Sequence, residues 1–444
     1  MDFNAFKEIA IAQAQQMGIG EYELYYEGSA STSVSAFQHE INEFSSATDG
    51  GVCFRCIVDG HMGYASTQEL SEAQAKQVVI RAADNASSLE SEEQEFLCPG
   101  GLEYAAPEKK DIPLPTTETL IHTILETQEK LYAADPAVID GCQAEGVVES
   151  SEIAICNSKG LDLHHASKRV ALITAAVVTD GKEMENDYQI KMGALPEIDT
   201  DAMVQKAVAS AKAKLGGEPA PTGQYPVVFD PDAMSSLIST FCSIFSSENT
   251  QKGLSRLGDQ EGKTIAAPIV TLVDDPFYKD GAMRPFDAEG CPTYCKNVIE
   301  NGQLMTLLYN LKTAAVAGKK TTGNAFKGGY DAAVGVRPFT MYLAPGDCTE
   351  EDLLAKAGTG VYINSLGGLH AGANPISGDF SLQSAGFLIE NGKKTAHVKS
   401  FTVAGNFYDL LLNITDIASN LEMPGMGRFG SPSVLVKGLS IAGK

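Results

Sequence analysis

The sequence lacks three features, and each absence argues against one class of protein. It has no apolar run approaching the roughly 20 residues that span a bilayer, so no membrane-spanning helix is expected. It has no basic excess: 33 Lys and Arg stand against 57 Asp and Glu, and the net charge of -24 disfavours direct binding of nucleic acid. Its nine cysteines lack the spacing of a disulfide framework, which favours reduced, mostly buried thiols.

The first residues, MDFNAFKEIAIAQAQQ, are typical of an amphipathic helix with an acidic start. A secretion signal would instead begin with basic residues and continue into an uninterrupted apolar segment. We therefore expect the protein to be cytoplasmic.

The length of 444 residues exceeds one ordinary core, so two domains are expected. The stretch GGEPAPTG at 216–223 is rich in glycine and proline and is the best domain boundary. We expect an N-terminal domain over 1–220 and a C-terminal domain over 221–444.

The N-terminal domain shows the order helix, strands, helix twice, over 1–90 and over 116–216. The two units share little residue identity, so the repeat is one of architecture only. Together they predict one antiparallel sheet layered by helices, an α+β arrangement. After the N-terminal helix, the expected helices span 71–85, 117–132 and 201–215.

Turn residues separate the strands expected in the first unit. The turns are placed at Asp49-Gly50 and Asp59-Gly60. The strands are expected at 21–27, 32–37, 51–59 and 62–66.

The C-terminal domain is predicted to be β-rich with a few helices. Asp230 followed by Pro231 is a favourable helix start, and this helix is expected to reach Ile244. Two hairpins of one type are expected, with type I′ turns at Asn301-Gly302 and Asn391-Gly392.

Two further helices are expected in this domain. Thr349 and Asp352 form a capping box for a helix over 350–357. A late helix is expected where Leu410, Ile414, Ile417 and Leu421 share one face.

A glycine-rich stretch at 362–392 reads YINSLGGLHAGANPISGDFSLQSAGFLIENG. This composition is expected where backbone passes close to a ligand. Its one histidine, His370, is favoured as a structural residue, because a lone histidine is more often structural than catalytic. The alternative is that His370 lines a groove in which an extended peptide adds as a strand. The candidate groove residues are Gly368, His370, Gly372, Asn374, Gly378 and Asp379.

This stretch, followed by VAGNFYDLLLNITDIASNLE, resembles the C-terminal signature of the TldD/PmbA family. TTGNAF at 321–326 and DDPF at 274–277 match as well, so the resemblance covers most of the chain after about Val227. RPFT at 337–340 departs from the Pro-Thr-Asn turn that the family tends to carry. The family is associated with zinc-dependent peptide cleavage by a heterodimer, and some members carry the label modulator of DNA gyrase.

The resemblance implies an HExxxH zinc motif on the helix that opens the second domain. Ile238, Ser239 and Ser243 stand at those positions, and their side chains cannot bind zinc or activate water. A further cysteine ligand is implied in MPGMGRFG, where Gly427 is the nearest counterpart and no cysteine follows Cys348. The chain thus resembles the PmbA (TldE) branch, with no catalytic residue or metal ligand of its own and zinc expected in a TldD-like partner.

Other metal-ligand patterns are weak. Cys53 and Cys56 have CxxC spacing but would point to opposite faces of a strand. Cys291 and Cys295 share a face but lie far apart unless the chain bends between them. Of the adjacent histidines at 164 and 165, only one could face any given site.

An acidic cluster lies within DDPFYKDGAMRPFDAEGCPT. It could bind a hard cation or act in acid–base pairs. The spacing of glycine and proline favours instead a loop whose aspartates cap turns, with Lys279 and Arg284 as charge partners. The candidate residues are Asp274, Asp275, Asp280, Asp287 and Glu289.

The preferred hypothesis is a non-catalytic subunit that shapes a chamber and presents extended peptide while an HExxxH-bearing TldD-like partner supplies zinc. One alternative is a homodimeric protein that binds peptides without cutting them. Another is a regulator that acts on DNA gyrase by protein contact. The weakest is a self-sufficient metalloprotease that uses His370 and the acidic loop.

Overall fold

The computed structural model describes residues 1–444 except 90–93, 108–110 and 280–282. One antiparallel six-stranded sheet, in the order β3-β2-β1-β4-β5-β6, spans both N-terminal units. The units join where β1 pairs with β4, for example at Val34 and Gly146. This confirms the predicted single sheet and the α+β fold. The strands are β1 (Glu21–Phe37), β2 (Glu40–Val58), β3 (His61–Thr67), β4 (Gln143–Asn157), β5 (Asp162–Thr179) and β6 (Met184–Met192).

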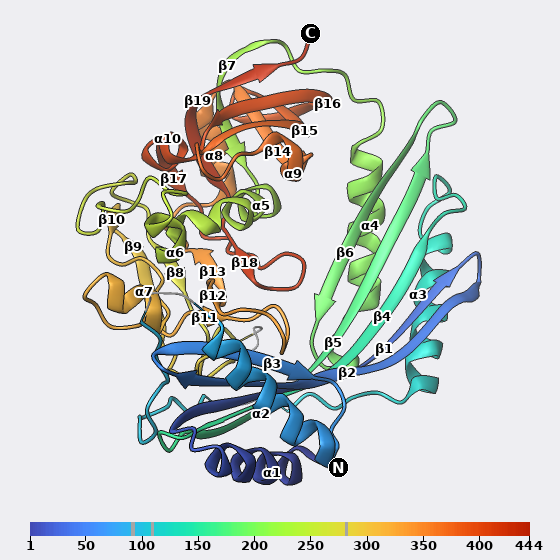
Figure 1. Ribbon diagram of the computed structural model, residues 1–444. Coiled ribbons are helices and arrows are strands. Elements are labelled where there is room, and N and C mark those ends of the chain that lie inside the picture. The colour runs from blue at the N-terminus through green and yellow to red at the C-terminus, as the bar shows by residue number, and fades with distance from the viewer. Residues whose placement is uncertain (90–93, 108–110, 280–282) are drawn as a thin grey trace.

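Four helices cover this sheet, and side-chain N-caps start all four. In the first unit α1 packs against α2, and both bury alanine-rich faces on the sheet (Figure 1). In the second unit α3 and α4 do the same. The helices are α1 (Phe3–Gln16), α2 (Glu72–Ser87), α3 (Thr117–Ala133) and α4 (Thr200–Ala213), with a short 3-10 turn η1 (Leu195–Glu197) before α4.

The predicted turn at Asp49-Gly50 is wrong, and the strands expected at 21–27 and 32–37 are one strand. The chain reverses at Gln38 and His39, whose φ angles are 51° and 66°. Gly50 instead lies within β2, where an added Cβ would meet the Glu27 carbonyl oxygen at 2.4 Å. The glycine permits close approach of two strands rather than a turn.

A second six-stranded sheet organises the C-terminal half, in the order β16-β15-β14-β7-β19-β17. An additional pairing of β16 with β19 closes it on itself, and the main apolar cluster fills it. We call it the closed sheet. Its strands are β7 (Gly223–Phe229), β14 (Gly360–Gly367), β15 (Asp379–Glu390), β16 (Lys393–Asn406), β17 (Ile414–Ile417) and β19 (Val434–Ala442).

A smaller sheet, in the order β10-β9-β8-β13-β18, and the pair β11-β12 lie between the closed sheet and the N-terminal sheet (Figure 1). Their strands are β8 (Leu272–Asp274), β9 (Lys296–Glu300), β10 (Gln303–Leu304), β11 (Ala325–Phe326), β12 (Gly335–Val336), β13 (Met341–Leu343) and β18 (Phe429–Gly430). The C-terminal helices are α5 (Pro231–Phe241) continued by η2 (Cys242–Phe245), α6 (Ser247–Gln251), α7 (Leu311–Val316), α8 (Glu350–Ala357), α9 (Leu369–Gly372) and α10 (Phe407–Leu412).

Local signals in this half are largely confirmed. Asp230 caps α5 by accepting from the Ala233 backbone N–H at 2.8 Å, and the capping box of α8 is present. Both Asn-Gly turns have positive φ at their two central residues. The late helix is wrong beyond Leu412, because Ile414 and Ile417 pair with β19 and bury β-branched side chains on the closed sheet.

All nine cysteines are free, and seven of them are buried. Cys53 and Cys56 lie in different apolar clusters on opposite faces of the sheet, as predicted. Within the described part of the chain, no helix is both long and apolar enough to cross a membrane.

Candidate functional site

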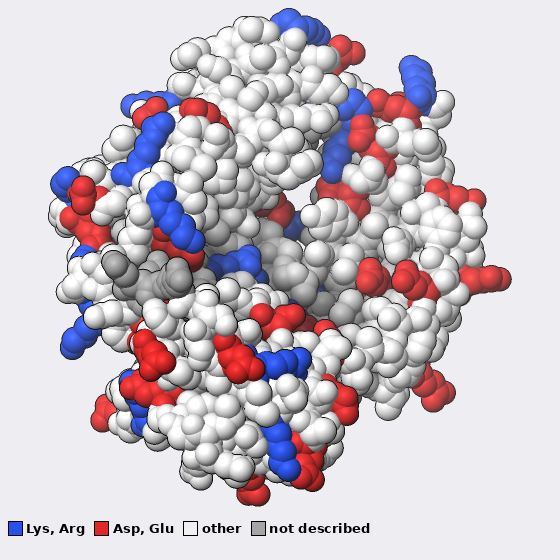
Figure 2. All heavy atoms as spheres, in the orientation of Figure 1, with Lys and Arg blue, Asp and Glu red and all other residues white. Residues whose placement is uncertain are grey.

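The molecule is hollowed at its centre (Figure 2), between α5 and α9 on one side and β6 and α4 on the other (Figure 1). An ion pair at 3.5 Å between Lys206 on α4 and Glu422, just before β18, joins the two sides. Across the hollow, the negative charge of Asp232 on α5 adds to partial burial in raising the pKa of Tyr188 on β6. The start of α5 therefore faces the edge strand β6.

Helix α5 and the 3-10 turn η2 that continues it carry the three positions at which the resemblance implies a zinc motif. Ile238 is buried in the apolar core, and Ser239 is exposed. Ser243 lies in η2, where its backbone carbonyl accepts from the Asn249 side chain at 2.9 Å. Cys242 adds no thiolate, because burial raises the pKa of its thiol to about 11. The donor set on this helix does not fit zinc.

Elsewhere the described residues contain no group of three or more His, Cys, Asp and Glu side chains that could hold a metal ion. His164 points outward and pairs with Glu152 at 2.7 Å, while His165 is buried against Phe286. Cys291 lies inside, 3.0 Å from Cys98 between sulfur atoms, whereas Cys295 is exposed. The pairs noted in the sequence therefore do not converge on one ion.

The glycine-rich stretch forms the turn around α9. Gly368 and Gly378 have φ angles of 73° and 81°, which only glycine adopts readily. The Asn374 side chain accepts from the backbone N–H groups of Ile376 and Ser377, and Asp379 accepts from the Asn406 amide at 2.8 Å. These two candidates thus hold the loop itself in shape.

Two other candidates in this stretch differ from them. His370 is exposed on α9. Gly372 packs so closely that an added Cβ would meet the Ser381 carbonyl oxygen at 2.4 Å. Of the six predicted groove residues, His370, Asn374 and Asp379 have exposed side chains, and within the described chain His370 is the one of these with no hydrogen bond that holds the loop. Its role in a groove stays a prediction.

The acidic candidates do not form one cluster. Asp274 is fully buried in β8, where it pairs with Lys296 at 3.1 Å and accepts from the Asn324 amide at 2.7 Å. Asp275 accepts from the Phe277 backbone N–H. Asp280 lies outside the described residues.

Asp287 and Glu289 lie elsewhere, at the seam with the N-terminal sheet. Asp287 accepts from three backbone N–H groups, those of Glu289, Cys291 and Ala325. Glu289 accepts from the Leu311 N–H at 2.8 Å. Burial raises the pKa of Asp287 to about 6, while burial together with the charge of Asp287 raises the pKa of Glu289 to about 8.

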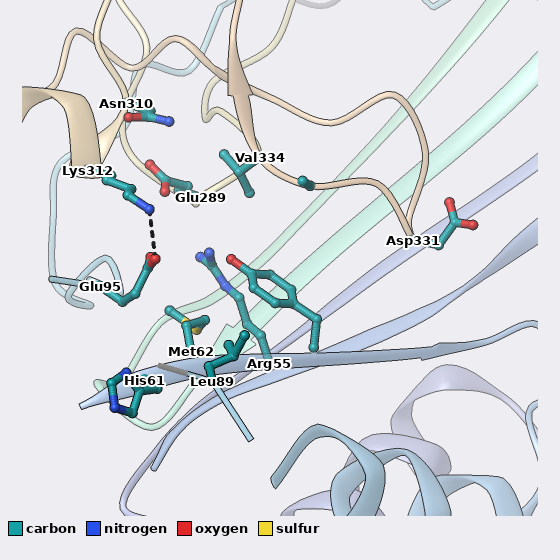
Figure 3. A pocket seen from close by; sticks show the side chains of 12 residues that line it. Arg55, His61, Met62, Leu89, Glu95, Glu289, Asn310, Lys312, Asp331 and Val334 are labelled. Carbon is teal, nitrogen blue, oxygen red and sulfur yellow. Dashed lines mark hydrogen bonds and ion pairs between the residues drawn. The ribbon is translucent and has the colours of Figure 1, made fainter. Parts of the chain in front are cut away.

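A pocket of about 510 Å³ opens beside Glu289, between β2 and β3 and the 310–334 segment (Figure 3). The Arg55 guanidinium points into it, held by Glu23 at 2.7 Å, and both residues are buried. At the mouth Lys312 pairs with Glu95 at 3.0 Å. Sequence reasoning missed this ion pair; the available signal was a single arginine inside the apolar strand text VCFRCIV.

Comparisons with known proteins cover nearly the whole chain. Family models match residues 22–86 as PmbA/TldA metallopeptidase domain 1, residues 110–215 as the central domain and residues 222–443 as the C-terminal domain. A Haemophilus influenzae relative named a metalloprotease PmbA homolog is 26% identical over 93% of this chain and 90% of its own length.

Two solved structures share the fold. A Thermotoga maritima protein described as a candidate modulator of a DNA gyrase has a TM-score of 0.91 and 29% identity, covering 99% of this chain and 100% of that one. TldE from Thermococcus kodakarensis has a TM-score of 0.86 over 98% of this chain and 100% of its own, and its 23% identity shows the fold alone.

Proposed function

The chain belongs to the TldD/PmbA family of metallopeptidases, and we propose that it is the subunit of a peptidase complex that binds and presents peptide without cutting it. One observation supports this above all: α5 and η2 carry Ile238, Ser239 and Ser243 where the family resemblance implies ligands and base. A TldD-like partner with HExxxH would hold the zinc and supply the activated water. This chain's residues then only bind, orient and exclude water from the peptide.

Strand β6 is the best place for an extended peptide to bind. It pairs with β5 on one side, and no strand of the described chain pairs with its other side. Its side chains Met184 and Tyr188 are 68% and 59% exposed, unusual for large apolar groups on an unprotected edge. Because the edge faces the hollow, a peptide could add to it as a further strand with sequence-independent backbone hydrogen bonds, displacing the Lys214 and Gln189 side chains that donate to the Asn186 and Tyr188 carbonyls.

Purification of the chain alone and with a TldD-like partner tests the proposal. Alone, it should contain no stoichiometric zinc and cleave no unfolded peptide. With the partner, chelator-sensitive cleavage should appear, with zinc in proportion to the partner. Robust chelator-sensitive cleavage by the isolated chain would overturn the assignment.

A homodimer that binds peptides without cutting them is the second candidate, since the free edge of β6 would serve it equally. It predicts peptide binding by the isolated chain and no added cleavage with the partner. Regulation of gyrase, suggested only by the description of the Thermotoga maritima protein, predicts instead that the chain recovers gyrase and no TldD-like subunit from cell extract.

A further inference from the structure

Arginines from distant parts of the chain converge near the end of α5. Arg428 lies just before β18, which packs against α5, and its carbonyl accepts from the Met341 N–H at 2.9 Å. Met341 is the first residue of β13, and Arg337 lies on the segment that leads into this strand. Both guanidinium groups lower the pKa of the Cys242 thiol, which burial raises, so both act on the end of α5.

These two arginines are unpaired. Within the described chain, the side chains of Arg337 and Arg428 make no ion pair and no hydrogen bond, although both are half-buried. The Arg337 guanidinium carbon lies 5.1 Å from the centroid of the Phe326 ring. Burial and the positive charges of Arg337, Arg284 and Arg169 lower the pKa of Arg428 to about 10.

The buried arginine of the pocket is treated differently. Burial lowers the pKa of Arg55, but Glu23 more than offsets this and holds that pKa above its ordinary value. The chain has 57 acidic residues against 33 basic ones, so carboxylates are plentiful. Unpaired like charges repel one another, and more strongly where water is partly excluded. A cluster left unpaired in so acidic a chain therefore indicates a site whose anion comes from outside.

We propose that Arg337 and Arg428 bind a carboxylate of the peptide substrate. The planar fork of arginine fits a carboxylate with two parallel hydrogen bonds. The carboxylate belongs either to a peptide C-terminus or to an Asp or Glu side chain. This inference rests on the proposed handling of extended peptide.

The test measures binding of acetyl-Glu-Glu to the purified chain by calorimetry, with acetyl-Gln-Gln-amide as the neutral probe. Wild type should prefer the acidic probe, and Arg428→Gln and Arg337→Gln should each weaken its binding at least about tenfold. Arg81→Gln, which removes an exposed arginine of α2, is the matched control and should bind like wild type. Equal binding by Arg428→Gln and wild type would overturn the proposal.

Two further probes separate the sources of the carboxylate. If acetyl-Glu-Glu-amide binds in an Arg428-dependent way, the site recognises side-chain carboxylates. If acetyl-Gln-Gln with a free C-terminus binds in an Arg428-dependent way, the site recognises the C-terminal carboxylate. Loss of both preferences refutes the site.

Thermal unfolding guards against a folding defect. Because Arg428 stands among like charges, Arg428→Gln should melt no lower than wild type, whereas a lower melting temperature would assign it a structural role and count against the site. Arg428→Lys should keep part of the binding through charge alone.

If acidic probes bind through these arginines while no peptide is cleaved with the partner present, the proposed function fails and this inference stands.

Discussion

Replacing Glu289 by glutamine should remove much of the pH dependence of this protein's stability. Glu289 is 4% exposed, and burial with the nearby charge of Asp287 raises its pKa from 4.5 to about 8. Between those values the folded protein holds a proton that the unfolded chain releases. Stability should therefore fall as pH rises from about 5 to about 8, by roughly 1.4 kcal/mol for each unit by which the folded pKa exceeds the unfolded one.

The glutamine keeps the contact that matters for folding. Its amide oxygen can still accept from the Leu311 N–H, which the Glu289 carboxylate now binds at 2.8 Å. It cannot ionise, so the variant should show a flatter curve and exceed wild type at pH 8 to 9. Because Asp287 shares the site and titrates with it, some slope should remain near pH 6.

Urea unfolding midpoints measured from pH 5 to 9 report the pH dependence of stability in wild type and in Glu289→Gln. Glu8→Gln, at an exposed position on α1, is the matched control and should keep the wild-type slope. A wild type that gains stability as pH rises through this range, or a Glu289→Gln variant with an unchanged slope, would refute the reasoning.

Three further changes test other parts of the structure. Arg55→Met leaves Glu23 buried without its partner and should cost about 3–5 kcal/mol in urea unfolding, whereas the exposed Arg81→Met should change stability by less than about 0.5 kcal/mol. Gly50→Ala puts a methyl group against the Glu27 carbonyl and should cost about 1–3 kcal/mol by the same measurement; an unchanged midpoint would contradict the close contact of the two strands there. Tyr188→Lys should raise the KM of the assembled complex about tenfold by removing one apolar contact, with Phe44→Lys as the exposed control; an equal effect of both would place the peptide elsewhere.

Local chemistry decided which features could be predicted from the sequence. Asp230 caps its helix because the side chain reaches a backbone N–H three residues on, and Asn-Gly turns need only two adjacent residues. Gly50 misled because glycine serves both turns and close strand contacts, and only the pairing partner distinguishes them. Ile414 and Ile417 have helical spacing, but β19 competes for them and prevails. Tertiary contacts decide such cases.

The candidate site was less predictable, because its charges come from segments far apart in the chain. Arg55 meets Glu23 across two strands, and Arg337 comes near Arg428 only through β13. No spacing rule connects those positions. The glycine-rich stretch was recognisable, yet its Asn374 and Asp379 side chains stabilise the loop, which a list of residue types could not show.

Buried and half-buried cations of this molecule differ in whether a carboxylate of the chain lies beside them. Arg55 pairs with Glu23 between β2 and β1, and Lys296 pairs with Asp274 between β9 and β8. Each charge is therefore matched within the chain and helps to hold its two strands in register. Near the end of α5, the side chains of Arg337 and Arg428 make no ion pair within the described chain. Their isolation is explained if the matching charge arrives with a peptide and leaves with it.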